Sequence, residues 1–489
     1  MKSLKVGVVG AGIAGIATAI RLAAKGNQVS VFESNSYPGG KLSEVRLGNY
    51  RFDAGPSLFT FPKLVEELFE LAGEDYHDNF EYIRLNRAAN YFFEDGTTFQ
   101  APGTKQDLIE VLGETFLDDT SDIEKFFRKS NTMYDYLGEM FMFNSLHDWR
   151  TFVSKSAFRS YANIPKMGFF DTMARSNEKD FKDPRLVQFF NRYATYNGSN
   201  PYATPATMNL ISHLEYGIGA FFPKKGMHSI TTSLVALAER LGVEFHLGEK
   251  VSAIELDNAK RVKGLKVGNE VIEFDRVVSN MDIVGTYRHL LKEVPAPNKI
   301  LKQPKSSSAL IFYWGISQEF PQLDLHNILF SGDYKEEFDH IFNRKNLYKD
   351  PTVYINITSK HKSDDAPAGA ENWFTMINTP HNTGQDWDQL IEKAKSNILE
   401  KLYRILKVDV SSFIEEESLL DPRLIESKTS SSQGALYGNS SNNKYAAFLR
   451  HANFSNKIKG LYFCGGSVHP GGGIPMALSS AKIVDRYFQ

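Results

Sequence analysis

Residues 5–33 read KVGVVGAGIAGIATAIRLAAKGNQVSVFE and carry the strongest structural signal in the chain. The apolar run Lys5–Val9 is typical of a buried strand. Apolar residues at helical spacing over Ile13–Ala24 predict a helix, and Val29–Phe32 predicts a second strand. Together they predict a strand–helix–strand unit of the Rossmann type, with a glycine-rich turn after its first strand.

The turn between this strand and helix has the spacing G-x-G-x-x-G. Gly10 permits a tight turn, Gly12 lets backbone approach a pyrophosphate, and Gly15 allows close packing of the helix. The helix N-terminus offers free N–H groups to phosphates. Glu33 ends the second strand, where it can bind ribose hydroxyls, and its charge argues against a 2′-phosphate. The residues predicted to face a dinucleotide are Gly10, Gly12, Ile13, Ala14, Gly15, Glu33 and Ser34. The alternative is a packing turn without a ligand.

The composition is that of an ordinary globular protein of two or three domains, with 489 residues, 42% hydrophobic residues and a net charge of -2. Such a balance provides no general basic field for nucleic acid. The single cysteine, Cys464, excludes an intrachain disulfide framework. The longest mostly apolar run, Val6–Ile20, is shorter than the ~20 residues of a membrane span, and a signal peptide is a weaker interpretation of it than the glycine turn. The 13% of aromatic residues fits either plain core or a large apolar ligand site.

A second glycine pair, Gly39-Gly40, follows this unit with Lys41 beside it. The extended pattern resembles the two-dinucleotide-binding flavoproteins of the glutathione-reductase-like class, in which such a segment runs along FAD. The stretch YRFDAGPSLF (50–59) is similar to the segment of amine-oxidase-like flavoproteins that lies near the flavin. The resemblance implies FAD as the cofactor and adds to the binding residues Gly39, Gly40, Lys41, Gly55, Pro56 and Ser57. An ordinary loop is the alternative for the glycine pair.

The stretch YFCGGSVHPGGGIPM (462–476) is also rich in glycine, so its backbone too is bare of side chains. Leu461–Cys464 predicts a strand, and Pro475 suits the first turn of a helix that continues over Ala477–Tyr487. The resemblance implies that these glycines lie against the flavin, where side chains would collide with the ring, and that the helix N-terminus points at it. The implied contacts are Gly465, Gly466, Gly473, Ile474 and Pro475.

Residues 221–282 form a further block with its own pattern. It predicts a helix over His228–Leu241 and strands over Val243–His246, Val251–Leu256 and Arg276–Val278. In the resemblance this block completes the FAD domain, so that Val251 contacts the adenine through its backbone and Asn280 lies near the cofactor. Plain structure is the alternative for both residues.

The fold class predicted is α/β, with a discontinuous Rossmann-like FAD-binding domain and an inserted α+β substrate domain. The FAD domain is expected over 1–70, 221–294 and 416–489, and the substrate domain over 71–220 and 295–415. Residues 71–220 are expected to be mostly helical and aromatic. The later part is expected to contain strands within 307–317, 351–360 and 372–380 and a helix over Asp386–Leu406.

Two segments, 183–215 and 460–482, resemble the phytoene-desaturase-type bacterial carotenoid desaturases, most of all their 1-hydroxycarotenoid 3,4-desaturase branch. The resemblance implies an FAD-dependent oxidoreductase of carotenoid biosynthesis. It would transfer a hydride from a substrate C–H to flavin N5 while the adjacent carbon loses a proton, as in 3,4-desaturation of a 1-hydroxycarotenoid. Two alternatives stay open: a carotenoid isomerase that uses reduced flavin, and an amine-oxidase-like flavoenzyme with a polar substrate.

No catalytic base stands out in the sequence. His469, Arg192 and Asp183 are candidates for acid–base work, and Arg192 or Asp183 could also orient a hydroxyl end group. Their alternatives are a turn-fixing role for His469 and ion pairs for the other two. Aromatic-rich segments that could line a tunnel for the substrate, or simply form core, are 133–143, 189–196 and 216–222. No metal site is predicted.

A carotenoid substrate implies contact with a membrane, and the expected location is cytoplasmic with peripheral membrane association. Residues 151–170 combine Phe, Tyr and Met with Lys155, Arg159 and Lys166 and contain no acidic residue, which suits an interfacial segment. A solvated helix is the alternative. The electron acceptor stays open between oxygen and a quinone, and no nucleic-acid partner is expected.

Overall fold

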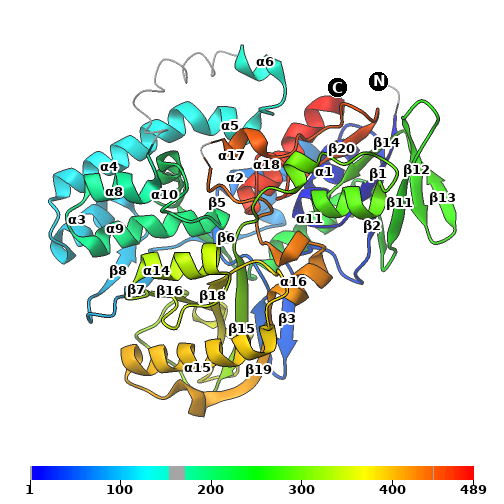
Figure 1. Cartoon of the computed structure of the whole chain (residues 1–489). Helices are drawn as coiled ribbons and strands as arrows, with labels where there is room; N and C mark the ends of the chain where they lie inside the picture. The colour runs from blue at the N-terminus through cyan, green and yellow to red at the C-terminus, as the bar shows by residue number, and fades with distance from the viewer. Residues whose placement is uncertain (1–2, 154–170, 444, 489) are drawn as a thin grey trace.

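The computed structural model describes residues 3–153, 171–443 and 445–488 (Figure 1). Its first sheet is parallel, with the strand order β10-β2-β1-β14-β20. The strands are β1 (Lys5–Val9), β2 (Gln28–Glu33), β10 (Glu244–Leu247), β14 (Arg276–Ser279) and β20 (Leu461–Phe463). Segments from the beginning, middle and end of the chain therefore meet in one sheet, as the predicted strand positions require.

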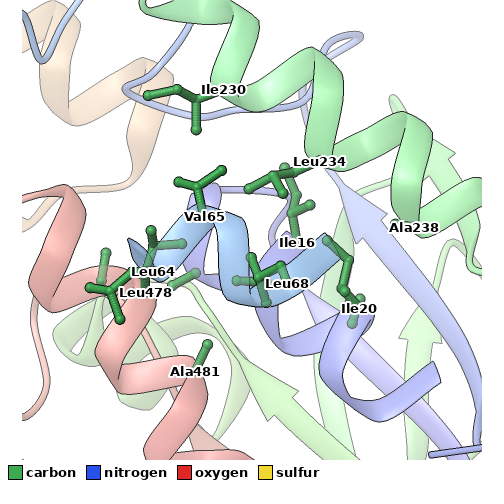
Figure 2. Packing of buried hydrophobic residues seen from close by; sticks show 14 of the residues in the cluster. Ile16, Ile20, Leu64, Val65, Leu68, Ile230, Leu234, Ala238, Leu478 and Ala481 are labelled. Carbon is green, nitrogen blue, oxygen red and sulfur yellow. The ribbon is translucent and has the colours of Figure 1, made fainter. Parts of the chain in front are cut away.

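Helices cover one face of this sheet. They are α1 (Ile13–Ala23), α2 (Lys63–Ala72), α11 (His228–Arg240) and α18 (Ile474–Asp485). Figure 2 shows their apolar side chains turned toward one another, with Ile16 of α1, Leu68 of α2, Leu234 of α11 and Leu478 of α18 all buried. Such burial supplies roughly 1.5–3 kcal/mol for each large apolar side chain. It fixes the N-termini of α1 and α18 at the same edge of the sheet.

The opposite face is covered by a small antiparallel sheet. It consists of β11 (Val251–Leu256), β12 (Val262–Val267) and β13 (Glu270–Glu273). Leu265 packs so closely on Gly7 that a Cβ atom there would lie 2.8 Å from it. Because successive residues of a strand face opposite sides, Val8 contacts the helices while Val9 contacts this second layer.

A second large sheet has seven strands in the order β19-β15-β18-β17-β16-β7-β8. They are β7 (Arg87–Phe92), β8 (Thr98–Pro102), β15 (Ser308–Ile316), β16 (His326–Leu329), β17 (Val353–Ile357), β18 (Glu371–Thr379) and β19 (Ile414–Leu420). Trp314 and Trp373 oppose each other on β15 and β18 and form a core with α15 (Trp387–Leu406). The three strands and the helix expected between 307 and 406 are thus present.

Residues 71–220 contain strands as well as the expected helices. The helices α3 (Lys105–Thr115), α4 (Thr120–Met133), α8 (Met173–Asp180) and α9 (Pro184–Asn191) form the group on the left of Figure 1. The hairpin β7-β8 nevertheless joins the seven-stranded sheet, through a parallel pair with β16. Its strand pattern is hidden because five consecutive residues of β7 are buried, so the sequence does not alternate.

The two large sheets are joined through the hairpin β3 (Glu44–Leu47) and β4 (Tyr50–Asp53). Tyr313 of β15 donates a hydrogen bond to the Ala54 carbonyl at 2.7 Å. Asn372 of β18 donates to the Arg51 carbonyl at 2.6 Å. These bonds hold the segment that follows β4, which contains Gly55 and Ser57, against the seven-stranded sheet.

Candidate cofactor site and adjoining cavity

The first glycine turn is closed by steric contacts that only glycine permits. A Cβ atom on Gly15 would lie 2.2 Å from the Gly10 carbonyl oxygen, and Gly10 has a φ of +98°. A Cβ atom on Gly12 would lie 2.7 Å from Asn280 Oδ1. Asn280 follows β14 and donates through Nδ2 to the Cys464 carbonyl at 3.3 Å. The predicted turn and Asn280 therefore lie together at the carboxyl ends of β1, β14 and β20.

The second glycine pair lies directly against the first turn. Gly39 N–H donates to the Ala11 carbonyl at 2.7 Å, and Gly39 pairs with Gly12 in an isolated parallel bridge. Gly39 and Gly40 have φ values of +105° and +58°, which favour glycine. A Cβ atom on Gly55 would lie 2.0 Å from the Lys41 carbonyl oxygen. Three segments predicted separately thus pack against one another through glycine backbone.

Glu33 is buried at the end of β2, beside the first glycine turn. Its carboxylate accepts from the Ala11 N–H and the Asn35 N–H, both at 2.9 Å, and from the Ser34 hydroxyl at 3.2 Å. Each backbone donor fixes the carboxylate orientation. Val251 begins β11 and is also buried, within the layer that covers β1.

Lys41 places a cation in this region. Its Nζ donates to the Leu436 carbonyl at 2.7 Å, and burial lowers the pKa of Lys41 to about 8. Asp282, which caps the short helix α12 (Ile283–Gly285), partly offsets that effect, and burial raises the pKa of Asp282 itself. An anion such as a diphosphate would stabilise the protonated form of Lys41.

The C-terminal glycines lie at the same edge of the parallel sheet. Gly465 N–H donates to the Ser480 hydroxyl at 2.8 Å, and a Cβ atom on Gly465 would lie 2.5 Å from Asn280 Nδ2. Gly473 is the N-cap of α18 and has a φ of +99°, with no heavy atom within 4 Å of its Cβ position. Ile474 and Pro475 form the first turn, whose free N–H groups provide a positive dipole end. These residues fit a planar ring with an electron-rich edge at the helix N-terminus, as a flavin has.

Arg450 holds this turn in place and was missed by the sequence analysis. Its guanidinium is buried and donates to the carbonyls of Tyr437 at 3.2 Å and Asn439 at 3.0 Å. A Cβ atom on Gly471 would lie 3.2 Å from the guanidinium, and burial lowers the pKa of Arg450 to about 10. No motif marks Arg450 in the sequence, because its partners are carbonyl groups.

A polar network adjoins Ser57 on the side of the seven-stranded sheet. The Ser57 and Tyr354 hydroxyls share a hydrogen bond of 2.8 Å, and the Tyr354 hydroxyl lies 2.7 Å from His326 Nδ1. Burial lowers the pKa of His326 to about 3, so its imidazole is neutral near pH 7.

Arg192 lies across a small cavity from this network. It donates to the Tyr91 hydroxyl at 2.6 Å and to the Tyr196 hydroxyl at 3.1 Å, and it lies 3.7 Å from the Glu215 carboxylate. Glu215 also accepts from the hydroxyls of Tyr193 and Tyr196. The polar residues that line the cavity are Arg192, Tyr196, Glu215, Thr60, His326 and Tyr354.

The three candidates for acid–base work lie in different surroundings, and no hydrogen bond or ion pair joins any two of them within the described ranges. Asp183 caps α9 and pairs with Arg185 at 2.7 Å. His469 is buried, with Nε2 2.9 Å from the Asn144 carbonyl, and burial lowers the pKa of His469 to about 3.

The aromatic segments contribute mainly to closed packing. Phe189, Phe190 and Tyr193 are fully buried in one cluster with Tyr216. The interfacial segment expected at 151–170 lies outside the described residues from 154 onward. Among the helices that the structure describes, none is long and apolar enough to cross a bilayer.

The fold and the packed glycine turns define a flavoprotein oxidoreductase. Residues 13–484 match the family model of flavin containing amine oxidoreductases. The chain is 52% identical over 476 residues to the 1-hydroxycarotenoid 3,4-desaturase of Flavobacterium sp. (strain P99-3). The aligned region covers 97% of this chain and 97% of that protein. It is 30% identical to the phytoene desaturase of Phycomyces blakesleeanus, over 97% of this chain and 83% of that protein. The chain belongs to the flavin-containing amine oxidoreductases and, within them, to the phytoene-desaturase-type group.

Solved structures agree on the fold. An oxidoreductase from Methanosarcina mazei superimposes with a TM-score of 0.63 at 15% identity, over 98% of this chain and 99% of that one. Cyclohexylamine oxidase from Brevibacterium oxydans gives a TM-score of 0.62 at 13% identity, over 99% and 98%. These structures confirm the predicted α/β fold class, and the family model together with the 52% identical relative confirms the family resemblance and the flavin cofactor.

Proposed function

We propose that this chain is an FAD-dependent carotenoid desaturase that acts on the 3,4 bond of a 1-hydroxycarotenoid. The observation that carries the proposal is the 52% identity to a protein of that activity over 97% of both chains. The packed glycine turns support it, because three separate segments bring glycine backbone together at one edge of the parallel sheet, where the Cβ position of Gly473 is open.

We assign FAD to this edge of the sheet by its donor groups. The Gly10–Gly15 turn and the N-terminus of α1 would hold the diphosphate, with Lys41 as the nearby cation. Glu33 would accept from the ribose, with Ser34 beside it, and Val251 would offer its backbone to the adenine. The residues assigned to the flavin end are Gly39, Gly40, Gly55, Pro56, Ser57, Asn280, Gly465, Gly466, Gly473, Ile474 and Pro475. When bound, FAD supplies the acceptor for the hydride.

The protein's own contribution is to position the substrate and exclude water. We propose that residues 71–220 and 295–415 form the substrate domain around the seven-stranded sheet, and that 1–70, 221–294 and 416–489 form the FAD domain. The boundary predicted at 416 moves to the end of β19, because Ile414–Leu420 pairs with β15 in the seven-stranded sheet. An allylic cation that develops beside a polyene is delocalised, so the neighbouring proton needs only a weak acceptor. His469 stays the candidate base, since its Nδ1 has no partner within the described residues. Asp183 fits a capping role.

We propose a peripheral membrane contact through the short helices α6 (Trp149–Phe152) and α17 (Ala446–Leu449). Their rings Phe152 and Phe448 stack with centroids 6.5 Å apart. Trp149 is 72% exposed and Phe448 is 49% exposed, and both helices lie near the top of Figure 1. Exposed aromatic side chains of this kind suit the bilayer interface, where a carotenoid would enter.

The membrane contact can be tested by co-sedimentation with liposomes. The double variant Trp149→Ser and Phe448→Ser should leave most of the protein in the supernatant. Leu117→Ser is the matched control, since Leu117 is 75% exposed but lies between α3 and α4. Equal sedimentation of all three proteins would contradict the proposed contact.

The reaction is tested by anaerobic incubation of the FAD-loaded protein with carotenoids in liposomes. Flavin bleaching together with the loss of two hydrogens from a 1-hydroxycarotenoid is the expected result. A product of changed retention but unchanged mass would indicate an isomerase, and bleaching by amines alone would indicate an amine oxidase. Reoxidation by oxygen or by a quinone then identifies the electron acceptor.

A further inference from the structure

We propose that the buried cavity beside Ser57 binds the tertiary hydroxyl group of the carotenoid, and that Glu215 and Arg192 are its main partners. This inference rests on the proposed function and adds the site that makes the enzyme specific for a hydroxylated end group. The cavity is lined by Arg192, Tyr196, Glu215, Tyr354 and the chain from 58 to 60.

The position of the cavity matches the chemistry of the substrate. In a 1-hydroxycarotenoid the oxygen is only three covalent bonds from C3, so its binding group must lie next to the reacting carbons. The proposed flavin-side segment ends at Ser57, and the cavity is lined by the residues that follow it. The Ser57–Tyr354 hydrogen bond connects the two places directly.

Arg192 and Glu215, which both line the cavity, have hydrogen-bonding capacity that their protein partners do not use. Arg192 uses Nη1 and Nη2 on tyrosine hydroxyls, whereas its buried Nε–H has no partner within the described residues. The Glu215 carboxylate accepts from two tyrosines and has capacity for further bonds, because a carboxylate has about four acceptor sites. A hydroxyl group donates once and accepts twice, so it can bond to both groups simultaneously.

Size and charge exclude other polar groups. The free space holds about one water molecule, which is the size of a hydroxyl oxygen. Arg192 and Glu215 offset each other's charge, and His326 is neutral. An ammonium or carboxylate ligand would therefore bring an uncompensated charge into a buried place. A neutral hydroxyl does not.

The same arrangement should reject a substrate without the hydroxyl. A hydrocarbon end group would leave the Arg192 and Glu215 groups without the bonds that a hydroxyl would make to them. Sites built to bond a substrate hydroxyl reject analogues that lack it far more strongly than apolar pockets reject a changed alkyl group. We therefore expect the cavity to determine which carotenoid end group is accepted, and the residues assigned to the flavin end to determine which reaction takes place.

The test compares a 1-hydroxycarotenoid with the 1,2-dihydrocarotenoid of the same polyene, which lacks only the oxygen. For each, kcat/KM is measured from anaerobic flavin reduction in liposomes and the product mass is recorded. The unaltered protein should prefer the hydroxylated substrate by at least about 100-fold. Tyr196→Phe and Glu215→Gln should lower this preference to below about tenfold, through loss on the hydroxylated substrate.

Glu337→Gln is the matched control, because Glu337 is a buried carboxyl group of the same domain that bonds to Thr352 away from the cavity. Flavin content and melting temperature report folding for each variant, and Tyr196→Phe removes only one hydroxyl if Glu215→Gln does not fold. A preference below about threefold in the unaltered protein would overturn the inference. So would variants that slow both substrates equally. Absence of flavin reduction by every carotenoid would instead overturn the proposed function.

Discussion

Gly15 packs so closely on Gly10 that a Cβ atom at position 15 would lie 2.2 Å from the Gly10 carbonyl oxygen. This contact brings α1 against the end of β1 and points its N-terminus at the proposed diphosphate position. The contact shows that Gly15 is required for packing, and under the proposed cofactor assignment the same residue also shapes the diphosphate site.

Gly15→Ala should release FAD. The added methyl group must push α1 away from the turn, at a cost of about 1–3 kcal/mol for overpacking. We expect FAD affinity, measured by fluorescence titration, to fall more than about tenfold. Gly26→Ala is the control: it is strained by its φ of +84° but its Cβ position is open, so stability should fall by about 1 kcal/mol with FAD affinity unchanged. Equal FAD affinity in both variants would contradict this role of Gly15.

FAD affinity should depend on pH through Lys41. Burial lowers its pKa to about 8, so the ammonium that favours a diphosphate is lost as pH rises through that value. We expect affinity to be constant from pH 6.5 to 7.5 and to fall about five- to tenfold by pH 9.5. The folding stability of the FAD-free protein should change with pH in the opposite direction to FAD affinity. Between pH 8 and 10.5 the unfolded chain binds more protons than the folded chain at Lys41, so this residue makes the free energy of unfolding rise with pH.

Two variants isolate the Lys41 charge. Lys41→Arg stays protonated over this range, so its FAD affinity should show no loss at high pH. Lys41→Met should bind FAD more weakly than Lys41→Arg at every pH, and its FAD affinity should also not change with pH. A slope that persists in both variants would assign the titration to another group.

Acid should unfold the protein because several histidines are buried in the neutral form. The pKa is lowered by burial to about 3 in His326 and His469 and to about 4 in His381 and His451. Between these values and about 6.5 the unfolded chain binds more protons, so stability falls as pH falls. Buried carboxyl groups whose pKa is raised act in the opposite direction. Glu337, with a pKa raised by burial to about 7, does so between pH 4.5 and 7, and Asp282 and Asp365, whose pKa values burial also raises, do so above pH 3.8.

His451→Gln should reduce this acid sensitivity. Removal of one such histidine should cut the stability lost between pH 6.5 and 4 by on the order of 2 kcal/mol, measured by urea unfolding. His77→Gln is the control, because the His77 side chain is 69% exposed. An unchanged pH slope in His451→Gln would show that His451 is protonated in the folded protein.

Arg450→Lys should loosen the C-terminal glycine turn. Lysine lacks the planar fork that reaches the Tyr437 and Asn439 carbonyls together, and each buried carbonyl left without a donor costs about 1–3 kcal/mol. We expect a lower melting temperature and loss of bound FAD during gel filtration. Arg128→Lys, on an exposed ion pair, should change stability by less than about 0.5 kcal/mol. Retention of FAD in Arg450→Lys would contradict the proposal.

The first glycine turn was predictable because its constraints are local. Gly10, Gly12 and Gly15 act within one turn, and the steric reason for each is contained in the spacing. The strand β7 was not predictable, since a strand buried on both faces has no alternation to detect. Its partner β8 does alternate, but over only five residues. The cavity could not be predicted for another reason. The sequence marks Arg192 as a candidate by itself, but the fold, and not a motif, brings Arg192 and Glu215 together.

The strand β20 pairs with β14 at the edge of the parallel sheet, and α18 packs on α1. Translation runs from the N-terminus, so β14 is made well before its partner β20, and α1 well before its partner α18. The parallel sheet and its helical layer therefore stay incomplete during synthesis until residues 461–485 have left the exit tunnel. We expect a product that ends before residue 461 to lack both the edge strand and the helix N-terminus assigned to the flavin, and so to bind FAD poorly.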